Sequence, residues 1–496
     1  MTWTLQAVSS PTRYIFVPAL LLLTALVGAF VAVEPMRGVL LAGAAALVVA
    51  SAVVPSVAVF VFVFVIYANI PAIVANTYGV PDYLAAASIA MLGIPLVRQI
   101  TMREPFVISP PLIPMVIYVA VVLLSAATAA YDAGERVGII LTEGFILFLL
   151  LSNAVRSVDT LRQVIWALLL AGALMSLVTI HQAVTQNYES TYGGFAVVER
   201  GFEVDVEGDT VRQLRAAGPV GEKNRFAQVL LVLVPLGIGR MKDARGRGRR
   251  LVATAATASI LAALVLTYSR GGVVAVGVVF LAAAALQFIR WRTLLATGAI
   301  VLAIAVILSP TFIGRVVSIG NAAELLSDGG DEAEGAIVGR ATSNIAAFNV
   351  LLDHPLLGVG PGLYGPNYSV DYANRLGLRH FDEPRRAHNL FLEVGAETGL
   401  LGLAAFVAVL LATAIPLWHV RRSWRYRNTE YANLATALLL SLLGYVTAGL
   451  FLHLAYERYL WIIVALAAST IWILTPETAR WSTARLRRAP VAEAAI

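Results

Sequence analysis

One short segment of the chain combines groups that could carry out acid–base chemistry and bind an anion. It reads "RRAHNLFLEVGAETGLLGL" and contains Arg385, Arg386, His388, Glu393 and Glu397. Histidine is the side chain best suited to accept a proton from a hydroxyl near neutral pH. Arginine forks bind phosphate oxygens through paired hydrogen bonds and stay charged. Because an apolar segment follows, the chemistry depends on which side of a membrane His388 lies.

Three further arginines are expected on the same side as His388. Arg215 lies in "RQLRAAGPVGEKNRFAQ", Arg270 in "TYSRGG" and Arg340 in "GAIVGRATSNIAAFNVLL". A cationic cluster with one group that titrates near neutrality suits an anionic, lipid-linked substrate whose pyrophosphate lies at headgroup depth. Each residue also has an ordinary explanation, since interfacial arginines extend to lipid headgroups or pair with carboxylates, and a lone loop histidine is often inert.

The composition indicates the elements that position these groups. Of the 496 residues 59% are hydrophobic and 13% charged, whereas soluble domains average about 25% charged. Crossing a bilayer core of about 30 Å takes roughly 20 apolar residues. We therefore predict an all-α polytopic membrane protein of 12–14 transmembrane helices. The lower counts apply if Pro55 only kinks one helix and if the short fourth span is not a helix that crosses the membrane. The spans are 14–33, 39–54, 56–74, 83–97, 112–130, 137–154, 163–181, 224–239, 251–268, 272–289, 293–309, 397–417, 432–452 and 459–474.

The basic loops set the predicted orientation. Loops rich in lysine and arginine normally stay in the cytoplasm, and "RMKDARGRGRR" is the clearest example. This rule places both termini in the cytoplasm of a multi-pass protein of the cytoplasmic (inner) membrane. It also explains the basic runs as topology determinants, so they do not indicate nucleic-acid binding. The first span is too long for a signal peptide and is interpreted as a retained helix.

The topology divides the chain into six segments. Two loops on the outer face are too long to be simple connectors and are the candidate functional regions. The segments are the N-terminal helices (1–181), a first extracytoplasmic loop (182–223), core helices (224–309), a large extracytoplasmic loop (310–396), three C-terminal helices (397–475) and a cytoplasmic tail (476–496).

No metal or cofactor site is predicted. The chain has no cysteine, which excludes disulfides and thiolate metal sites. The histidines lack metal-ligand spacing, and the acidic run "SDGGDEAEG" lacks the spacing of an EF-hand and is interpreted as a solvated loop. The segment "GVGPGLYG" is not framed as a dinucleotide fingerprint. It predicts a tight turn, with a backbone nest for a phosphate or sugar as the alternative.

An ordered set of motifs resembles the O-antigen ligase and polymerase superfamily. The motifs are "GPVGEKNRFAQVL", "TYSRGG", the pair Gly339 and Arg340, "DHPLLGVGPGLY" and "HNLFLEVGAETGLLGL". The similarity extends from about Arg215 to Leu403, and the arrangement is more specific than any single motif. It implies a bundle related to the C-type glycosyltransferases, with a large extracytoplasmic loop before the last three helices.

The resemblance also implies an activity and roles for the candidate residues. Family enzymes move a glycan from undecaprenyl pyrophosphate to an acceptor hydroxyl without a metal. Ligases use a lipid A core oligosaccharide as acceptor, and polymerases use another lipid-linked repeat unit. By this resemblance His388 is the general base, while Arg215 and Arg340 hold the pyrophosphate and stabilise its developing charge. Arg270 either assists them or is structural.

The remaining charged residues are expected to bind substrate around the base. Glu393 and Glu397 either orient His388 or pair with Arg385 and Arg386. A flippase and a chain-length regulator are the expected neighbours of a protein of this superfamily.

Several other functions stay open at this point. Polymerases and O-linked protein glycosyltransferases of the same superfamily would use the same base and arginines. A transporter would bind its solute near the bilayer midplane, where Glu143 is one of few ionisable residues. A non-catalytic scaffold would keep the fold without needing His388.

Overall fold

The computed structural model describes most of the chain after residue 54. The described residues are 55–78, 92–206, 209–292, 295, 298–299, 332–377 and 380–475. The predicted spans at 14–33 and 39–54 lie outside these residues, as do most of those at 83–97 and 293–309.

The described residues form helices and a single hairpin. The first part contains α3 (Pro55–Tyr67), α4 (Ile70–Tyr78), α6 (Gly93–Thr101), α7 (Leu112–Thr128), α8 (Gly134–Ile139), the π-helical turn η1 (Ile140–Ile146), α9 (Leu147–Ala154), α10 (Val158–Thr185), β1 (Val197–Val206), β2 (Asp209–Gly218), α11 (Lys223–Asp243), α12 (Arg247–Leu266) and α13 (Arg270–Ala285). The second part contains α16 (Glu332–Asp353), η3 (Tyr364–Tyr368), α17 (Ser369–Arg375), α18 (Leu390–Trp424), α19 (Thr429–Gly449) and α20 (Arg458–Leu474).

The helices confirm an all-α polytopic membrane protein. Among the described residues, five helices are long and apolar enough to cross a membrane. The count is six if α3 and α4, which bend by 52° at a short break, form one span. This break falls inside the predicted span 56–74, where Asn69 adopts a left-handed φ of 59°. The shorter apolar helices α7, α13 and α20 also coincide with predicted spans.

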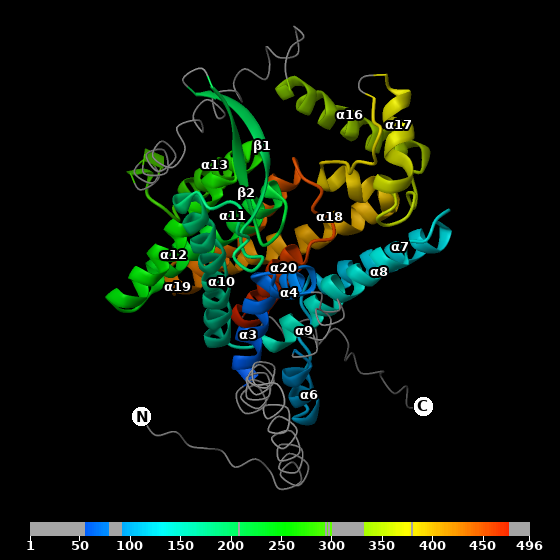
Figure 1. Ribbon diagram of the computed structural model, residues 1–496. Helices are drawn as coiled ribbons and strands as arrows, with labels where there is room; N and C mark the ends of the chain where they lie inside the picture. Colours follow the sequence, from blue (N-terminus) through cyan, green and yellow to red (C-terminus); the bar gives the residue numbers. More distant parts are fainter. Residues whose placement is uncertain are drawn as a thin grey trace, which may run out of the picture.

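The first predicted extracytoplasmic loop contains a β-hairpin that the sequence analysis did not anticipate. Strands β1 and β2 pair antiparallel, with Val197 opposite Gly218 and Glu199 opposite Arg215. The segment "VVERGFEVDV" alternates apolar and charged residues towards its end, the period expected of a strand. The hairpin, in green, projects beyond the helices beside α11 (Figure 1).

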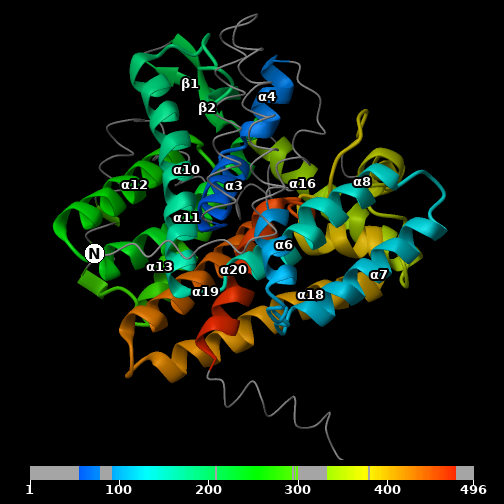
Figure 2. The ribbon, with the colours of Figure 1, turned by 90° about the horizontal axis from the view of Figure 1, so that it is seen from below.

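The helical core is built around α11 and α20. Helix α11 packs against α10, α12 and α19, and its middle from Phe226 to Gly237 is buried throughout. A helix that is apolar all round is expected in the interior of a bundle. Helix α18 lies along α7 and α19 (Figure 2). Trp461 of α20 packs against both α7 and α18, with its ring centre 6.2 Å from the ring centres of Tyr118 in α7 and Phe406 in α18.

Candidate functional site

His388 lies directly before the N-terminus of α18. The next residue, Asn389, caps this helix, because its side-chain oxygen accepts hydrogen bonds from the backbone N–H groups of Phe391 and Leu392. His388 itself has a left-handed φ of 52°, which is uncommon for a residue other than glycine. Its ring meets the ring of His453, from the α19–α20 connection, edge to face at 5.4 Å.

Both imidazoles of this pair are neutral at pH 7. Burial, followed by the positive charges of Arg340, Arg385 and Arg386, lowers the pKa of His388 from 6.5 to about 4. Burial and then the charge of Arg386 also lower the pKa of His453. The Nδ1 atoms of both rings are buried and have no hydrogen-bond partner among the described residues. Neutral imidazole is the form that accepts a proton.

Arg340 and Arg270 belong to the same charged neighbourhood. Loss of hydration and the positive charge of Arg270 lower the pKa of Arg340, and the negative charge of Glu222 opposes this change. Because Arg340 also lowers the pKa of His388, Arg340 lies within electrostatic reach of both Arg270 and His388. The structure therefore brings Arg270, Arg340 and His388 together, and their roles stay predictions.

Two helix N-termini are joined next to these arginines. Ser269 caps α13 by accepting a hydrogen bond from the N–H of Gly272 at 3.2 Å, and its hydroxyl pairs with Oδ1 of Asn224 at 2.9 Å. Asn224 in turn donates to the carboxylate of Glu222, which caps α11. The motifs "GPVGEKN" and "TYSRGG" thus form one structural unit. Helix N-termini carry partial positive charge and favour bound anions.

Arg215 is placed differently from the other predicted arginines. It extends from β2, is buried, and donates from Nε to the carbonyl of Thr267 and from Nη2 to that of Tyr268, both at 3.0 Å. These bonds fasten the hairpin to the end of α12, immediately before Arg270. Arg215 therefore positions the turn that carries Arg270, and a direct contact between Arg215 and pyrophosphate stays a prediction.

Glu393 forms an ion pair with Arg386. The distance from Nε of Arg386 to Oε1 of Glu393 is 2.6 Å, and Glu393 is 1% exposed. Burial by itself lowers the pKa of Arg386, but the negative charges of Glu393 and Glu397 outweigh this effect and raise the pKa above its ordinary value. Of the two roles considered for Glu393, the structure shows pairing with an arginine. The exposed Arg385 instead lies over the ring of Phe381 at 4.6 Å.

Glu397 joins α18 to the glycine-rich segment. Its buried carboxylate accepts hydrogen bonds from the N–H of Gly362, at 2.8 Å, and from the hydroxyl of Tyr456. Its backbone carbonyl accepts from Gly360 at 2.9 Å. The segment predicted as a tight turn or a nest is therefore a turn with positive φ at Gly358, Gly360 and Gly362. At Gly362 its backbone donor already binds a protein carboxylate.

A pocket of about 390 Å³ opens beside this turn. Its lining includes Arg136, Gly362, Arg386 and Glu397. Arg136 lies over the ring of Tyr456 at 5.4 Å. The pocket thus combines two guanidinium groups with the buried carboxylate of Glu397 and the carboxylates of Asp132 and Glu135, a polar lining that can hydrogen-bond hydroxyl groups.

The connection between α19 and α20 makes contacts with the site that were not predicted from the sequence. His453 contacts His388, Tyr456 donates to Glu397, Glu457 pairs with Arg225 at 3.3 Å, and Arg458 pairs with Glu143 at 2.9 Å. The available signal was the run "HLAYER", with charged and aromatic residues between two apolar spans. Glu143, considered above for transport, is thus an ion-pair partner within a π-helical turn, a feature often found near functional sites.

A metal site would need several histidine, aspartate or glutamate side chains close together among the described residues. They contain no group of three or more histidine, aspartate or glutamate side chains that could hold a metal ion. The acidic run 327–335 lies mostly outside them.

These features define a multi-pass membrane protein with a charged site at the start of α13 and α18. Residues 255–407 match the family model described as O-antigen ligase, which confirms the resemblance to the O-antigen ligase and polymerase superfamily. The matched range includes Arg270, Arg340, His388, Glu393 and Glu397, whereas Arg215 precedes it. No match was found among curated proteins.

Proposed function

We propose that the chain is a glycosyltransferase that moves a glycan from undecaprenyl pyrophosphate to an acceptor hydroxyl at the outer face of the cytoplasmic membrane. One observation carries the proposal. Within the matched range, a neutral His388 is surrounded by the positive charges of Arg340, Arg385 and Arg386. This arrangement supplies a proton acceptor next to groups that bind a phosphate leaving group.

The proposed reaction is a direct displacement. The neutral imidazole of His388 takes the proton of the acceptor hydroxyl, whose oxygen attacks the anomeric carbon. The bond from that carbon to the pyrophosphate oxygen breaks, and undecaprenyl pyrophosphate leaves with the electron pair. Arg340, with Arg270 at the N-terminus of α13, stabilises the charge that develops on it. Direct attack predicts an inverted anomeric configuration.

The course of the helices supports the proposed orientation. Helices α13 and α18 both begin at the site, at Arg270 and next to His388. Helix α18 ends among Arg421, Arg422 and Arg425. Since arginine-rich ends favour the cytoplasm, we place the site and the segments 182–223 and 310–396 outside, and both termini inside.

The test measures surface polysaccharide and undecaprenyl-linked glycan in cells that lack the chain. We expect surface polysaccharide to disappear and undecaprenyl-linked glycan to build up, with recovery on complementation. Long unattached chains indicate a ligase, single repeat units indicate a polymerase, and loss of glycan from proteins indicates an O-linked protein glycosyltransferase. Normal surface glycans without lipid-linked build-up contradict the proposal and favour a transporter or scaffold.

Replacing Arg340 with alanine is expected to weaken use of the donor. Loss of a charge-assisted contact to phosphate, worth about 1.5–3 kcal/mol, lowers kcat/KM roughly 10- to 100-fold. The measurement is kcat/KM for the lipid-linked donor with purified enzyme. Arg375→Ala is the matched control, because Arg375 pairs with Asp371 on the exposed side of α17. Equal values for the two variants contradict a donor-binding role for Arg340.

The lowered pKa of His388 predicts a distinctive pH dependence. A base works only when unprotonated, so activity falls as the pH drops through its pKa. In the free enzyme this pKa is about 4, and kcat/KM should fall near that pH. A bound pyrophosphate offsets the positive charges that lower the pKa, so the fall in kcat should occur at a higher pH. The mechanism is contradicted if kcat and kcat/KM fall at the same pH. It is also contradicted if the fall at low pH persists in the His388→Ala variant.

A further inference from the structure

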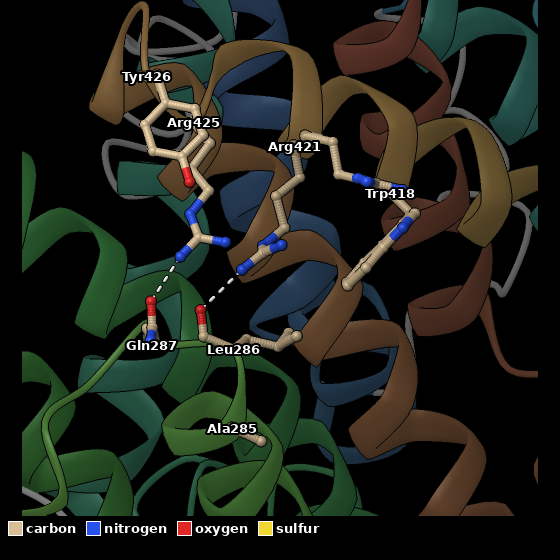
Figure 3. A pocket seen from close by; sticks show the side chains of 8 residues that line it. Ala285, Leu286, Gln287, Trp418, Arg421, Arg425 and Tyr426 are labelled. Atoms are coloured by element: carbon tan, nitrogen blue, oxygen red, sulfur yellow. Dashed lines mark hydrogen bonds between the residues drawn. The ribbon is translucent and has the colours of Figure 1, made fainter.

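A second pocket lies at the end of α18 opposite to His388. It has a volume of about 480 Å³ and lies between the C-terminal ends of α13 and α18. Figure 3 shows Arg421, Arg425, Trp418 and Tyr426 on one side and the backbone at Leu286 on the other. Neither the proposed donor nor the acceptor uses this region, since the reaction is placed at the start of these helices.

Within the described ranges, no carboxylate balances the positive charge of this pocket. Its lining includes Arg421, Arg422 and Arg425 and contains no acidic side chain. Arg421, which is 6% exposed, donates from Nη2 to the carbonyl of Leu286 at 2.7 Å. Arg425 donates to the amide oxygen of Gln287 at 2.5 Å. None of the ion pairs within the described part of the chain involves these three arginines, so a bound anion would supply the missing negative charge.

The aromatic and apolar surroundings indicate what kind of anion fits. Trp418 and Tyr426 line the pocket, and such rings are typical of the level where lipid headgroups meet the acyl chains. Arg421 lies near the ring of Trp418 at 4.9 Å. One to two turns earlier on the same face of α18, Leu411 and Ile415 are more than half exposed. In a membrane protein such residues contact acyl chains, so the anion should carry them.

We propose that this pocket binds the phosphate of an anionic phospholipid headgroup. Guanidinium groups bind phosphate oxygens through paired hydrogen bonds, and basic pockets between helices on the cytoplasmic side suit such headgroups. General attraction of basic loops to a membrane needs charge alone. Here a buried arginine is fixed by a backbone carbonyl within a pocket that spans two helices, which is the arrangement of a specific site.

The test is the binding of phosphatidylglycerol to the purified chain, measured by native mass spectrometry. The pocket variant is Arg422→Gln with Arg425→Gln, which leaves the buried Arg421 in place. Two pocket arginines contribute roughly 30-fold in affinity, so we expect the first phosphatidylglycerol to bind about 30-fold more weakly. Arg427→Gln with Arg250→Gln is the matched control. Both arginines are exposed and lie outside the pocket, and their replacement removes the same amount of charge. The control should bind as the wild type does.

Other outcomes overturn the proposal. Equal affinity of the pocket variant and the control shows that general charge attracts the lipid. Phosphatidylcholine that binds as tightly as phosphatidylglycerol excludes selection by charge. Inorganic phosphate that binds as tightly as phosphatidylglycerol identifies a free-anion site and overturns the lipid assignment. The single variant Arg422→Gln, whose side chain is exposed, should retain the wild-type melting temperature and still bind more weakly, which separates lost binding from lost folding.

Discussion

Replacing His388 with alanine is expected to lower the rate of glycan transfer roughly 100- to 10,000-fold, the range typical of a lost general base. The ring of His388 lies next to the charges of Arg340, Arg385 and Arg386 but makes no hydrogen bond through Nδ1 within the described part of the chain. Its removal should therefore change proton transfer more than folding. The measurement is kcat and KM for the lipid-linked donor with purified enzyme, and kcat should fall while KM stays near its wild-type value.

The same loop offers a matched control for this replacement. His380 is exposed and its Nε2 lies 3.3 Å from a carboxylate oxygen of Asp382. His380→Ala should keep full activity, because this histidine lies on the surface and its ring faces Asp382. A His388→Ala enzyme that works within tenfold of the control would fall below the range expected for a general base. In that case His388 supports the structure, and another group or water takes the proton.

Replacing Gly399 with alanine is expected to destabilise the folded protein by roughly 3 kcal/mol or more, the sum of backbone strain and overpacking. Gly399 interrupts α18 with φ 66° and ψ −171°, a conformation essentially restricted to glycine. An added Cβ would lie 2.2 Å from the carbonyl oxygen of Leu356. This oxygen belongs to the backbone of the "HPLLGVGPG" segment, which pairs with the break through the bond from Leu400 N–H to Pro355 carbonyl at 2.7 Å.

Thermal unfolding of the detergent-solubilised protein tests this prediction. Gly277→Ala in α13 is the control, because an added Cβ there meets no atom within 4 Å. Alanine in an open helical position should leave the melting temperature unchanged or raise it. Gly399→Ala should unfold at a clearly lower temperature and lose activity. Unfolding of both variants at the wild-type temperature would mean that the turn and the break are not held as described.

The sequence was informative about the helices because their signal is local. Long apolar runs predict spans, and α7, α10, α12, α19 and α20 begin and end within a few residues of the predicted bounds. The start of α18 was predicted seven residues late, because Asn389 caps about two further turns that include the charged Glu393. The β-hairpin was overlooked, since the long acidic segment was considered only as a loop.

The site was predicted through its motifs more than through its geometry. The motifs placed Arg270, Arg340 and His388 on one side, and the structure brings them into one charged neighbourhood. The pairing of Glu393 with Arg386, seven residues away, was one of the two roles that the sequence offered. The partners of Arg215 were out of reach, because a buried arginine can bind carbonyls from segments more than 50 residues away. His453 was dismissed for lacking a metal-ligand partner, although ring contacts follow no fixed spacing in sequence.

The connection between α19 and α20 has a consequence for how substitutions in it behave. Its side chains from His453 to Arg458 attach to four separate partners, His388, Glu397, Arg225 and Glu143. A stretch of six residues has few independent backbone rotations, so shifting one attachment moves the other three. The energetic effects of paired replacements here should deviate from additivity. The short connection therefore makes the pocket beside Glu397 and the ion pairs around Glu143 parts of one mechanical unit.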